Sequence, residues 1–315
     1  MSRIIFETDP WIDTLVRSYG YTKHSVGRGS LFLHVKSRVF GNRLISLPFS
    51  DYGKPGSSSS EELAELLEEV KAEYAEVRVP EWKRETIEYL KEAGFEEVVS
   101  YKTFLLRIDK PAEFLWTQLN KKVRNSVRYA VKKGVKVKRV ESLDDLKGFY
   151  SLYLRGAREL GSPPHTFKFY KTLKNSLGDR LLIDVALLGE TLIGGIVVLA
   201  GDRWANFWQN IALRKYRRFN ASYLLLWNII EELSAINFEI FDFGRTREGT
   251  GVYFFKKKWG GEEKKIYHMA YSLKRRVNPP DPHQRKYLLL SRLWRKIPLK
   301  ATEIIGSRLI GGIAL

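Results

Sequence analysis

The densest grouping of residues that could do chemistry is the segment 242–261, with the sequence DFGRTREGTGVYFFKKKWGG. Its glycines would let backbone amides approach an oxyanion or phosphate, and its Arg and Lys side chains supply fixed positive charge. We therefore predict a site for an anionic substrate, with a glycine-rich hairpin whose lysines keep an exposed edge soluble as the alternative. The candidate substrate-binding residues here are Asp242, Arg245, Gly249, Thr250 and Gly251, and the candidate catalytic residues are Tyr253 and Lys256.

Three side chains have specific candidate roles. Arg245 is suited to a bidentate pair with a carboxylate or phosphate of the substrate, or alternatively to an ion pair with Asp242. Tyr253 either relays a proton and orients an acceptor amine or packs in the core. His165 lies in a proline-rich loop with the sequence GSPPH, where it is a candidate base or an incidental loop histidine.

Two further segments are strongly basic. Residues 121–139 contain nine basic side chains and no acidic one, and residues 214–221 read RKYRRFNA. We predict that Arg124 and Arg128 in the first segment, and Arg217 and Asn220 in the second, contact an anionic substrate. An ordinary solvated helix face is the alternative for the first segment, although solvation alone would be served as well by mixed charges.

The elements that must position these residues form two successive mixed α/β halves. In the first half, strand-like stretches occupy 4–7, 31–36, 43–47 and 95–107, and helical patterns occupy 63–77 and 80–93, the first opened by a capping box of Ser59 and Glu62. In the second half we expect helices over 116–130, 143–160, 167–177 and 221–235, and strands over 181–188, 191–200, 203–211 and 238–243.

The motifs together resemble FemAB-like transferases of the GNAT acyltransferase superfamily, the relatives of peptidoglycan-bridge peptidyltransferases. The match is nearest to the branch associated with exosortase and exopolysaccharide gene clusters. The match rests mainly on the segment 242–261. Three earlier segments also match, in the same order as in the family: residues 46–53 (SLPFSDYG), 122–128 (KVRNSVR) and 161–165 (GSPPH).

This resemblance implies a mixed α/β fold of two tandem GNAT-like domains, over 1–110 and 111–275, followed by a basic amphipathic tail over 276–315. It places Lys256 at the active centre, where we assign it to stabilising the oxyanion or the phosphate side of the donor. It also implies that Tyr52 lines the acceptor groove, and Trp208 is a candidate groove or core residue. The implied activity is acyl or aminoacyl transfer to an amine of a cell-envelope or surface-polysaccharide precursor.

The donor is predicted from a departure at residues 214–221. Acetyl-CoA-dependent GNAT enzymes place a glycine-rich loop before the central helix to hold pyrophosphate on backbone amides. Arg217 stands here where the first glycine belongs, which argues against ordinary CoA binding and favours aminoacyl-tRNA or another activated acyl donor. An acetyl-CoA-dependent N-acetyltransferase acting on an amino sugar stays open as an alternative.

Composition narrows the function further. The chain has 315 residues, a net charge of +18, no Cys and five His, so we expect no disulfide, no metal site and no cofactor beyond the donor. Residues 1–110 carry 16 basic and 18 acidic side chains, so 38 basic and 18 acidic remain beyond them. This second part would attract nucleic acid, anionic lipid or diphosphates, and a non-catalytic protein that binds tRNA or anionic membranes is therefore a further alternative.

The remaining expectations concern location and the tail. The N-terminal residues lack an apolar run, so we predict neither a signal peptide nor a membrane span there, and a cytoplasmic location. After a break at 278–282, an amphipathic segment places Leu289, Leu293 and Trp294 opposite Arg292 and Arg295. Residues 284–315 are therefore either helices docked on the protein body or a peripheral contact with the inner face of an anionic membrane. The oligomeric state is not predicted.

Overall fold

The computed structural model describes residues 4–273, 277, 279 and 285–314. Within these residues, eleven strands form one sheet in the order β1-β2-β3-β4-β11-β5-β10-β9-β8-β7-β6. The pairs β3–β4 and β10–β9 are parallel, and the other neighbouring strands are antiparallel. The strands are β1 (Thr22–Val26), β2 (Ser30–Val35), β3 (Arg43–Ile45), β4 (Tyr74–Pro80), β5 (Glu96–Arg107), β6 (Val135–Arg139), β7 (Leu181–Leu188), β8 (Thr191–Ala200), β9 (Trp204–Ala212), β10 (Ile240–Asp242) and β11 (Glu262–Tyr271).

The helices lie on both sides of this sheet, so the mixed α/β class is confirmed. They are α1 (Asp9–Tyr19), α2 (Ser60–Glu69), α3 (Arg84–Glu92), α4 (Ala112–Gln118), α5 (Lys121–Lys132), α6 (Leu143–Leu160), α7 (Phe167–Leu177), α8 (Ala221–Ala235), α9 (Gly251–Lys257), α10 (Arg285–Trp294) and α11 (Leu299–Ile313). Short 3-10 helices cover η1 (Ile5–Glu7), η2 (Gly178–Arg180) and η3 (Arg214–Phe219).

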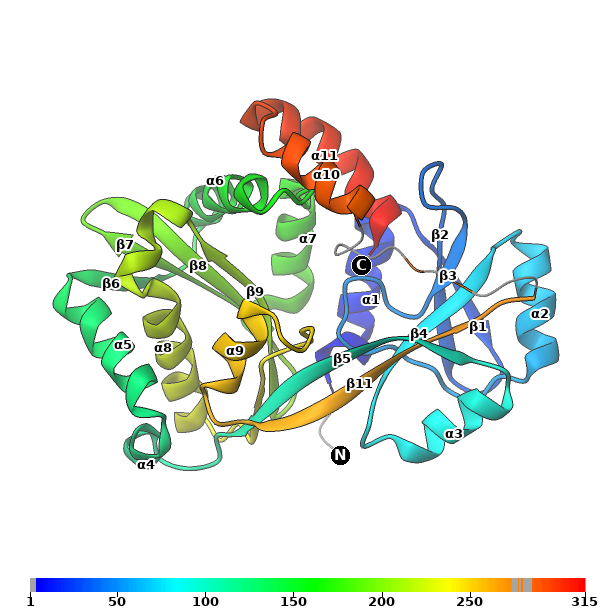
Figure 1. The fold of residues 1–315 in the computed structure, drawn as a ribbon, viewed down its shortest axis with the longest axis horizontal. Helices are drawn as coiled ribbons and strands as arrows, with labels where there is room; N and C mark the ends of the chain where they lie inside the picture. Colours follow the sequence, from blue (N-terminus) through cyan, green and yellow to red (C-terminus); the bar gives the residue numbers. More distant parts are fainter. Residues whose placement is uncertain (1–3, 274–276, 278, 280–284, 315) are drawn as a thin grey trace.

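The two halves of the chain share the sheet. Strand β11 comes late in the sequence, yet it pairs with β4 and β5 of the first half. Figure 1 shows β5 and β11 crossing the centre of the molecule, with β9, β8, β7 and β6 of the second half on one side of them. The segment between β10 and β11, which holds the predicted site, is therefore anchored by strands in the middle of the molecule.

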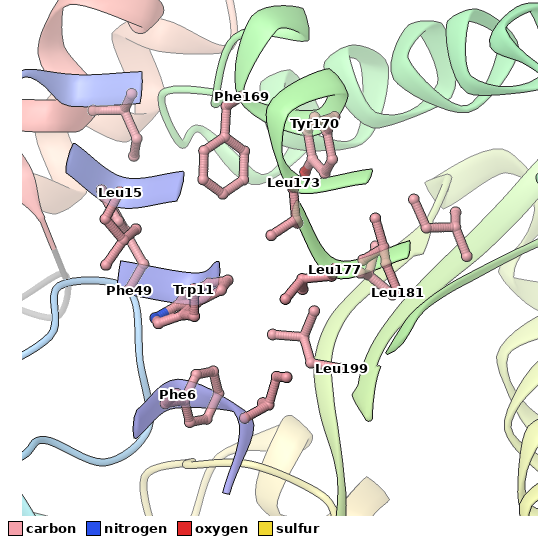
Figure 2. Close-up of a cluster of buried hydrophobic side chains, with 14 of the residues drawn as sticks. Phe6, Trp11, Leu15, Phe49, Phe169, Tyr170, Leu173, Leu177, Leu181 and Leu199 are labelled. Atoms are coloured by element: carbon pink, nitrogen blue, oxygen red, sulfur yellow. The ribbon is translucent and has the colours of Figure 1, made fainter. Parts of the chain in front are cut away.

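An apolar cluster also joins the halves (Figure 2). Phe6, Trp11 and Phe49 from the first half pack with Phe169 and Leu177 of α7, and none of these side chains is more than 6% exposed. Because burial of such side chains is the main stabilising term in folding, this contact fixes α1 and the loop after β3 against α7.

The local signals explain most element ends. The Ser59–Glu62 capping box begins α2, and a second box of Ser142 and Asp145 begins α6. Helix α6 ends at Gly161, whose φ of 77° is accessible to glycine at little cost. Helices α6, α7 and α8 have the predicted bounds.

Several predicted elements were wrong in type or extent. Residues 4–7 form a 3-10 turn rather than a strand, and α1 and β1 follow it. The predicted helix over 63–77 stops early, because Lys71 adopts a φ of 53° and Tyr74 begins a strand. The helix over 116–130 is two helices, α4 and α5, separated by the extended residue Leu119 and the cap residue Asn120.

The tail begins partly outside the described residues. Of the predicted break at 278–282, only Pro279 is described, and Gln284 and Leu315 of the predicted contact segment also lie outside. The described tail consists of α10 and α11, which Figure 1 shows along one edge of the molecule in orange and red. Within the described ranges, no helix combines the length and apolar character needed to cross a bilayer.

Candidate active site

A cavity of about 230 Å³ lies where the two halves meet. Its walls come from the loop after β3, the loop before α7, strand β9, the loop after β10 and helix α9. The lining residues are Phe49, Asp51, His165, Phe207, Trp208, Gln209, Gly244, Arg245 and Lys256. The structure thus brings four of the predicted site residues, His165, Trp208, Arg245 and Lys256, into one cavity.

Lys256 lies on the last turn of α9 and is buried, with 7% of the residue exposed. Its Nζ donates hydrogen bonds to the carbonyl oxygens of Gly244 (2.8 Å) and Arg245 (3.0 Å). Burial lowers the pKa of Lys256 to about 8, although the negative charges of Asp51 and Asp242 oppose this shift. Since an ammonium group has three protons and two are held by carbonyls, one remains for a group in the cavity.

Arg245 and Asp51 form an ion pair in the cavity wall. The Arg245 Nε lies 3.3 Å from Asp51 Oδ1, and both side chains are largely buried. Gly244 makes this approach feasible, because a Cβ on that residue would lie 2.7 Å from Asp51 Oδ2 and 2.9 Å from the carbonyl oxygen of Phe207. Gly244 also has a φ of 69°, in the left-handed region that favours glycine.

The loop that carries Asp51 has an unusual backbone. Leu47 and Phe49 both have a φ of 61°, and both side chains are buried. Bulky residues rarely adopt this conformation, and such conformations persist where the surrounding structure enforces them, often at functional sites. Here Trp208 Nε1 donates to the Phe49 carbonyl oxygen at 2.9 Å, and Arg78 Nη1 donates to the Ser50 carbonyl oxygen at 2.8 Å.

His165 contributes an aromatic wall. Its ring lies 4.6 Å from that of Phe169 and 4.8 Å from that of Phe49, measured between centroids. Nδ1 shares a hydrogen bond with the Tyr19 hydroxyl, and the backbone N–H donates to the Tyr153 hydroxyl at 2.9 Å. Burial lowers the pKa of His165 to about 3, so the ring is neutral at physiological pH.

Asp242 and Tyr52, both predicted to contact substrate, are fully buried and are not among the residues that line the cavity. Asp242 Oδ2 accepts hydrogen bonds from the Tyr52 hydroxyl (2.6 Å) and Asn206 Nδ2 (3.0 Å), and its Oδ1 accepts from the Gly244 N–H (2.8 Å). Burial, followed by the charge of Asp51, raises the pKa of Asp242 to about 6. Asp242 therefore supports the loop, and the ion pair offered as the alternative for Arg245 forms with Asp51 instead.

The predicted residues at the start of α9 have structural contacts. Thr250 is the helix N-cap, and its hydroxyl accepts from the Tyr253 N–H at 3.2 Å. The Tyr253 hydroxyl donates to Glu263 Oε2 at 2.7 Å, and Tyr253 is buried without lining the cavity, which favours the core-packing alternative. Gly249 and Gly251 flank the cap without lining the cavity.

The predicted basic contacts also lie outside the cavity wall. Arg124 and Arg128 are on α5, where Arg124 Nη1 donates to the Thr117 carbonyl oxygen at 3.3 Å and Arg128 lies over the Trp116 ring. Arg217 is exposed in η3, and Asn220, with a φ of 55°, connects η3 to α8. A 3-10 helix therefore occupies the place before α8 where a glycine-rich loop would hold pyrophosphate.

Five cavity residues were absent from the predicted site residues. They are Phe49, Asp51, Phe207, Gln209 and Gly244. Phe49, Asp51 and Gly244 stand within the SLPFSDYG and DFGR motifs, so motif position could have identified them. Phe207 and Gln209 have no such motif position, because their role depends on which face of β9 meets the first half of the chain.

A second cavity, of about 600 Å³, lies in the first half near Lys54, Trp82 and Lys83. None of its charged lining residues is buried, and Lys83 is already paired with Glu7 at 2.7 Å. Charged groups exposed to water are weak electrostatic catalysts, so the smaller cavity is the better candidate. Among the described residues, no three His, Cys, Asp or Glu side chains come together in a way that could hold a metal ion.

Comparisons with known proteins bear on the family and the fold. Residues 119–257 match the family model described as an acetyltransferase (GNAT) domain. The structure is similar to the crystal structure of FemX, with 15% identity, a TM-score of 0.63 and coverage of 94% of this chain and 95% of that chain. L-PGS from Bacillus licheniformis is similar with 10% identity, a TM-score of 0.57 and coverage of 92% of this chain and 98% of that chain. None of the curated proteins compared with this sequence is significantly similar to it.

The family match includes seven of the nine cavity residues, all but Phe49 and Asp51, and the likeness to FemX extends over both halves. Residues 119–257 are therefore similar to a GNAT domain, and the chain as a whole has a fold similar to that of FemX, which confirms the predicted FemAB-like fold.

Proposed function

We propose that this protein transfers an aminoacyl or acyl group to an amine of a cell-envelope precursor, with the reaction taking place in the cavity around Lys256. The observation that supports this most directly is a buried ammonium group with one uncommitted proton, facing a cavity that also contains a carboxylate. In a site of low polarity, such a donor stabilises a developing negative charge far better than it would in water.

The reaction proceeds as the acceptor amine attacks the carbonyl carbon of the donor ester. A carbon–nitrogen bond forms, and the carbonyl electron pair moves onto oxygen, where the remaining Lys256 N–H stabilises it. The Asp51 carboxylate takes the proton that the amine loses. As the tetrahedral intermediate collapses, the bond from carbon to the leaving oxygen of the donor breaks, and Asp51 passes the proton to that oxygen, which regenerates the carboxylate. His165, neutral and buried, orients the acceptor within the aromatic wall.

For the donor we propose an aminoacyl-tRNA. Residues 214–219 form a 3-10 helix with four exposed or half-buried cations, without the glycine amides that would hold the pyrophosphate of CoA. Cations of this kind suit a nucleic-acid backbone. The basic α5 surface with Arg124 and Arg128 is a second region suited to the same backbone, separate from the cavity.

The direct test is turnover by the purified full-length chain. tRNA charged with labelled amino acids is incubated with amine-bearing lipid extracts and nucleotide-linked amino sugars, and label in the acceptor is measured. We expect transfer by the wild type and its loss on Lys256→Ala with the fold retained by circular dichroism. Absence of turnover with every donor, or equal turnover by wild type and Lys256→Ala, would contradict the proposal.

The match to an acetyltransferase family model favours a second candidate, acetyl transfer from acetyl-CoA to an amino sugar. Calorimetric titration with CoA separates the two, because the aminoacyl proposal predicts no binding at the start of α8. Micromolar CoA binding together with acetylation of an amino sugar would establish this candidate instead. A non-catalytic tRNA-binding protein would show salt-sensitive binding that Lys256→Ala leaves unchanged.

A further inference from the structure

The tail helices, α10 and α11, dock on the body through small and buried residues. A Cβ on Gly306 would lie 2.3 Å from Pro164 Cδ, and a Cβ on Gly311 would lie 3.0 Å from Tyr19 Cδ1. Trp294 and Ile310 are each 8% exposed. The tail therefore has a defined inner side, which is packed against the protein.

The outer side has an unusual composition. From Leu289 to Ala314, every exposed side chain that the structure describes is Leu, Ile, Arg or Lys, apart from Pro298. Leu289, Leu290 and Leu293 are 58%, 55% and 61% exposed. The single acidic residue of this range, Glu303, is half-buried and lies against Tyr150. The exposed apolar side chains are Leu289, Leu290, Leu293, Ile304 and Ile305, and the exposed cations are Arg292, Arg295, Lys296, Lys300 and Arg308.

We propose that this outer side of the tail helices binds the surface of an anionic lipid bilayer. Clustered exposed apolar side chains among cations mark interaction surfaces, and their exposure to water has no benefit for a free protein. On a bilayer, the Leu and Ile side chains enter the boundary between headgroups and acyl chains, while Arg and Lys pair with anionic headgroups. A nucleic acid would use the cations and leave the leucines in water.

The tail is also attached directly to the cavity wall. The docking contacts are made with Pro164, which precedes His165, and with Tyr19, which hydrogen-bonds to the His165 ring. At the end of α11, buried Arg43 donates to the carbonyl oxygens of Gly312 and Ile313. A bilayer bound to the outer side would thus hold the cavity at a fixed position relative to lipid-linked amines. Membrane binding by the tail does not depend on the proposed transfer chemistry.

Vesicle flotation of the full-length protein tests the proposal. We expect binding to vesicles that contain phosphatidylglycerol and much weaker binding to pure phosphatidylcholine, with a loss as salt rises. The triple variant Leu289→Ser, Leu290→Ser, Leu293→Ser (the Ser variant) and the triple variant Arg292→Gln, Lys296→Gln, Lys300→Gln (the Gln variant) should each weaken binding at least about tenfold. Arg295 is left in place, because its Nη2 donates to the Leu160 carbonyl oxygen of the body at 3.2 Å. Phe114→Ser is the matched control, since Phe114 is 51% exposed on α4, away from the tail, and should bind as the wild type does.

Three outcomes would overturn the proposal. The first is no binding to phosphatidylglycerol vesicles at low salt. The second is tRNA binding that the Gln variant abolishes while the Ser variant leaves both tRNA and vesicle binding unchanged, which would assign the cations to nucleic acid. The third is a wild-type dimer in light scattering that the Ser variant converts to a monomer, without any vesicle binding, which would assign the leucines to a second copy. Transfer to a water-soluble acceptor should be unchanged in both tail variants, so a failure here is distinguishable from a failure of the proposed chemistry.

Discussion

Asp51 Oδ1 and Arg245 Nε lie 3.3 Å apart across the junction of the two halves of the chain. Their pairing leaves the Asp51 carboxylate in the cavity beside Lys256 and holds the loop after β3 against the loop after β10. The two motifs that carry the resemblance therefore meet through this ion pair and through the Tyr52–Asp242 hydrogen bond, and both motifs contribute residues to the cavity wall.

The ion pair predicts coupling between Asp51 and Arg245. Arg245→Lys should lower kcat/KM at least about tenfold, because lysine lacks the Nε that contacts the carboxylate. A double-mutant cycle with Asp51→Asn and Arg245→Lys, measured by kcat/KM and by urea unfolding, should give a coupling energy of about 0.5–3 kcal/mol. Strict additivity in both measurements would show that the two residues act independently.

The lowered pKa of Lys256 predicts an alkaline limb, a fall of kcat on the alkaline side of its pH profile. Its pKa is lowered to about 8, so the ammonium form is present below that pH and is lost as the pH rises through it. We expect kcat to fall above about pH 8 in the wild type, and Lys256→Ala to lower kcat about 10²–10³-fold at pH 7. Lys256→Arg, if active, should show no such limb because the guanidinium stays charged.

The neighbouring Lys257 provides the control for this experiment. Its side chain is 57% exposed and lies 3.7 Å from Glu263, outside the cavity. Lys257→Ala should keep the wild-type kcat and the wild-type limb. A limb that moves with Lys257→Ala, or persists unchanged in Lys256→Arg, would assign the titration to another group.

Asp242 predicts a large effect on stability. An amide at this position cannot accept from all the donors that converge on the carboxylate, including Asn206 Nδ2 and the Gly244 N–H. Asp242→Asn should therefore lower the free energy of unfolding by about 1–3 kcal/mol at pH 7, measured by urea denaturation. Asp202→Asn is the control. Asp202 is 51% exposed and its ion pair with Arg180, at 3.6 Å, is exposed to water and therefore weak, so this variant should change the free energy of unfolding by less than about 0.5 kcal/mol.

Gly244 predicts a steric effect that can be separated from backbone strain. Gly244→Ala adds a Cβ 2.7 Å from Asp51 Oδ2, whereas Gly20→Ala has the same left-handed backbone, with a φ of 70° against 69°, and no atom within 4 Å. In both variants, backbone strain should lower the free energy of unfolding by roughly 1 kcal/mol. Only Gly244→Ala should also lose transfer activity and several degrees more in Tm, and equal losses in the two variants would refute the close-contact argument.

The sequence by itself determined the elements with strong local signals and two charged residues of the segment between β10 and β11. The capping box of Ser59 and Glu62 predicted the start of α2, the helices α6, α7 and α8 were predicted with their observed bounds, and the DFGR and lysine motifs pointed to Arg245 and Lys256. It did not separate β4 from the preceding helix, because Tyr74 and Val77 fit a helical period until Lys71 turns the chain.

The tertiary structure alone decided which polar groups face the cavity. Asp242, Tyr52 and Tyr253 have the chemistry of site residues, yet their oxygens are hydrogen-bonded to side chains from other elements. Asp51 and Gln209 reach the cavity because β11 and the apolar cluster around Trp11 and Phe169 bring distant segments together. Side-chain chemistry is local and can be read from residue types, whereas burial and partner choice depend on long-range packing, which a single sequence does not display.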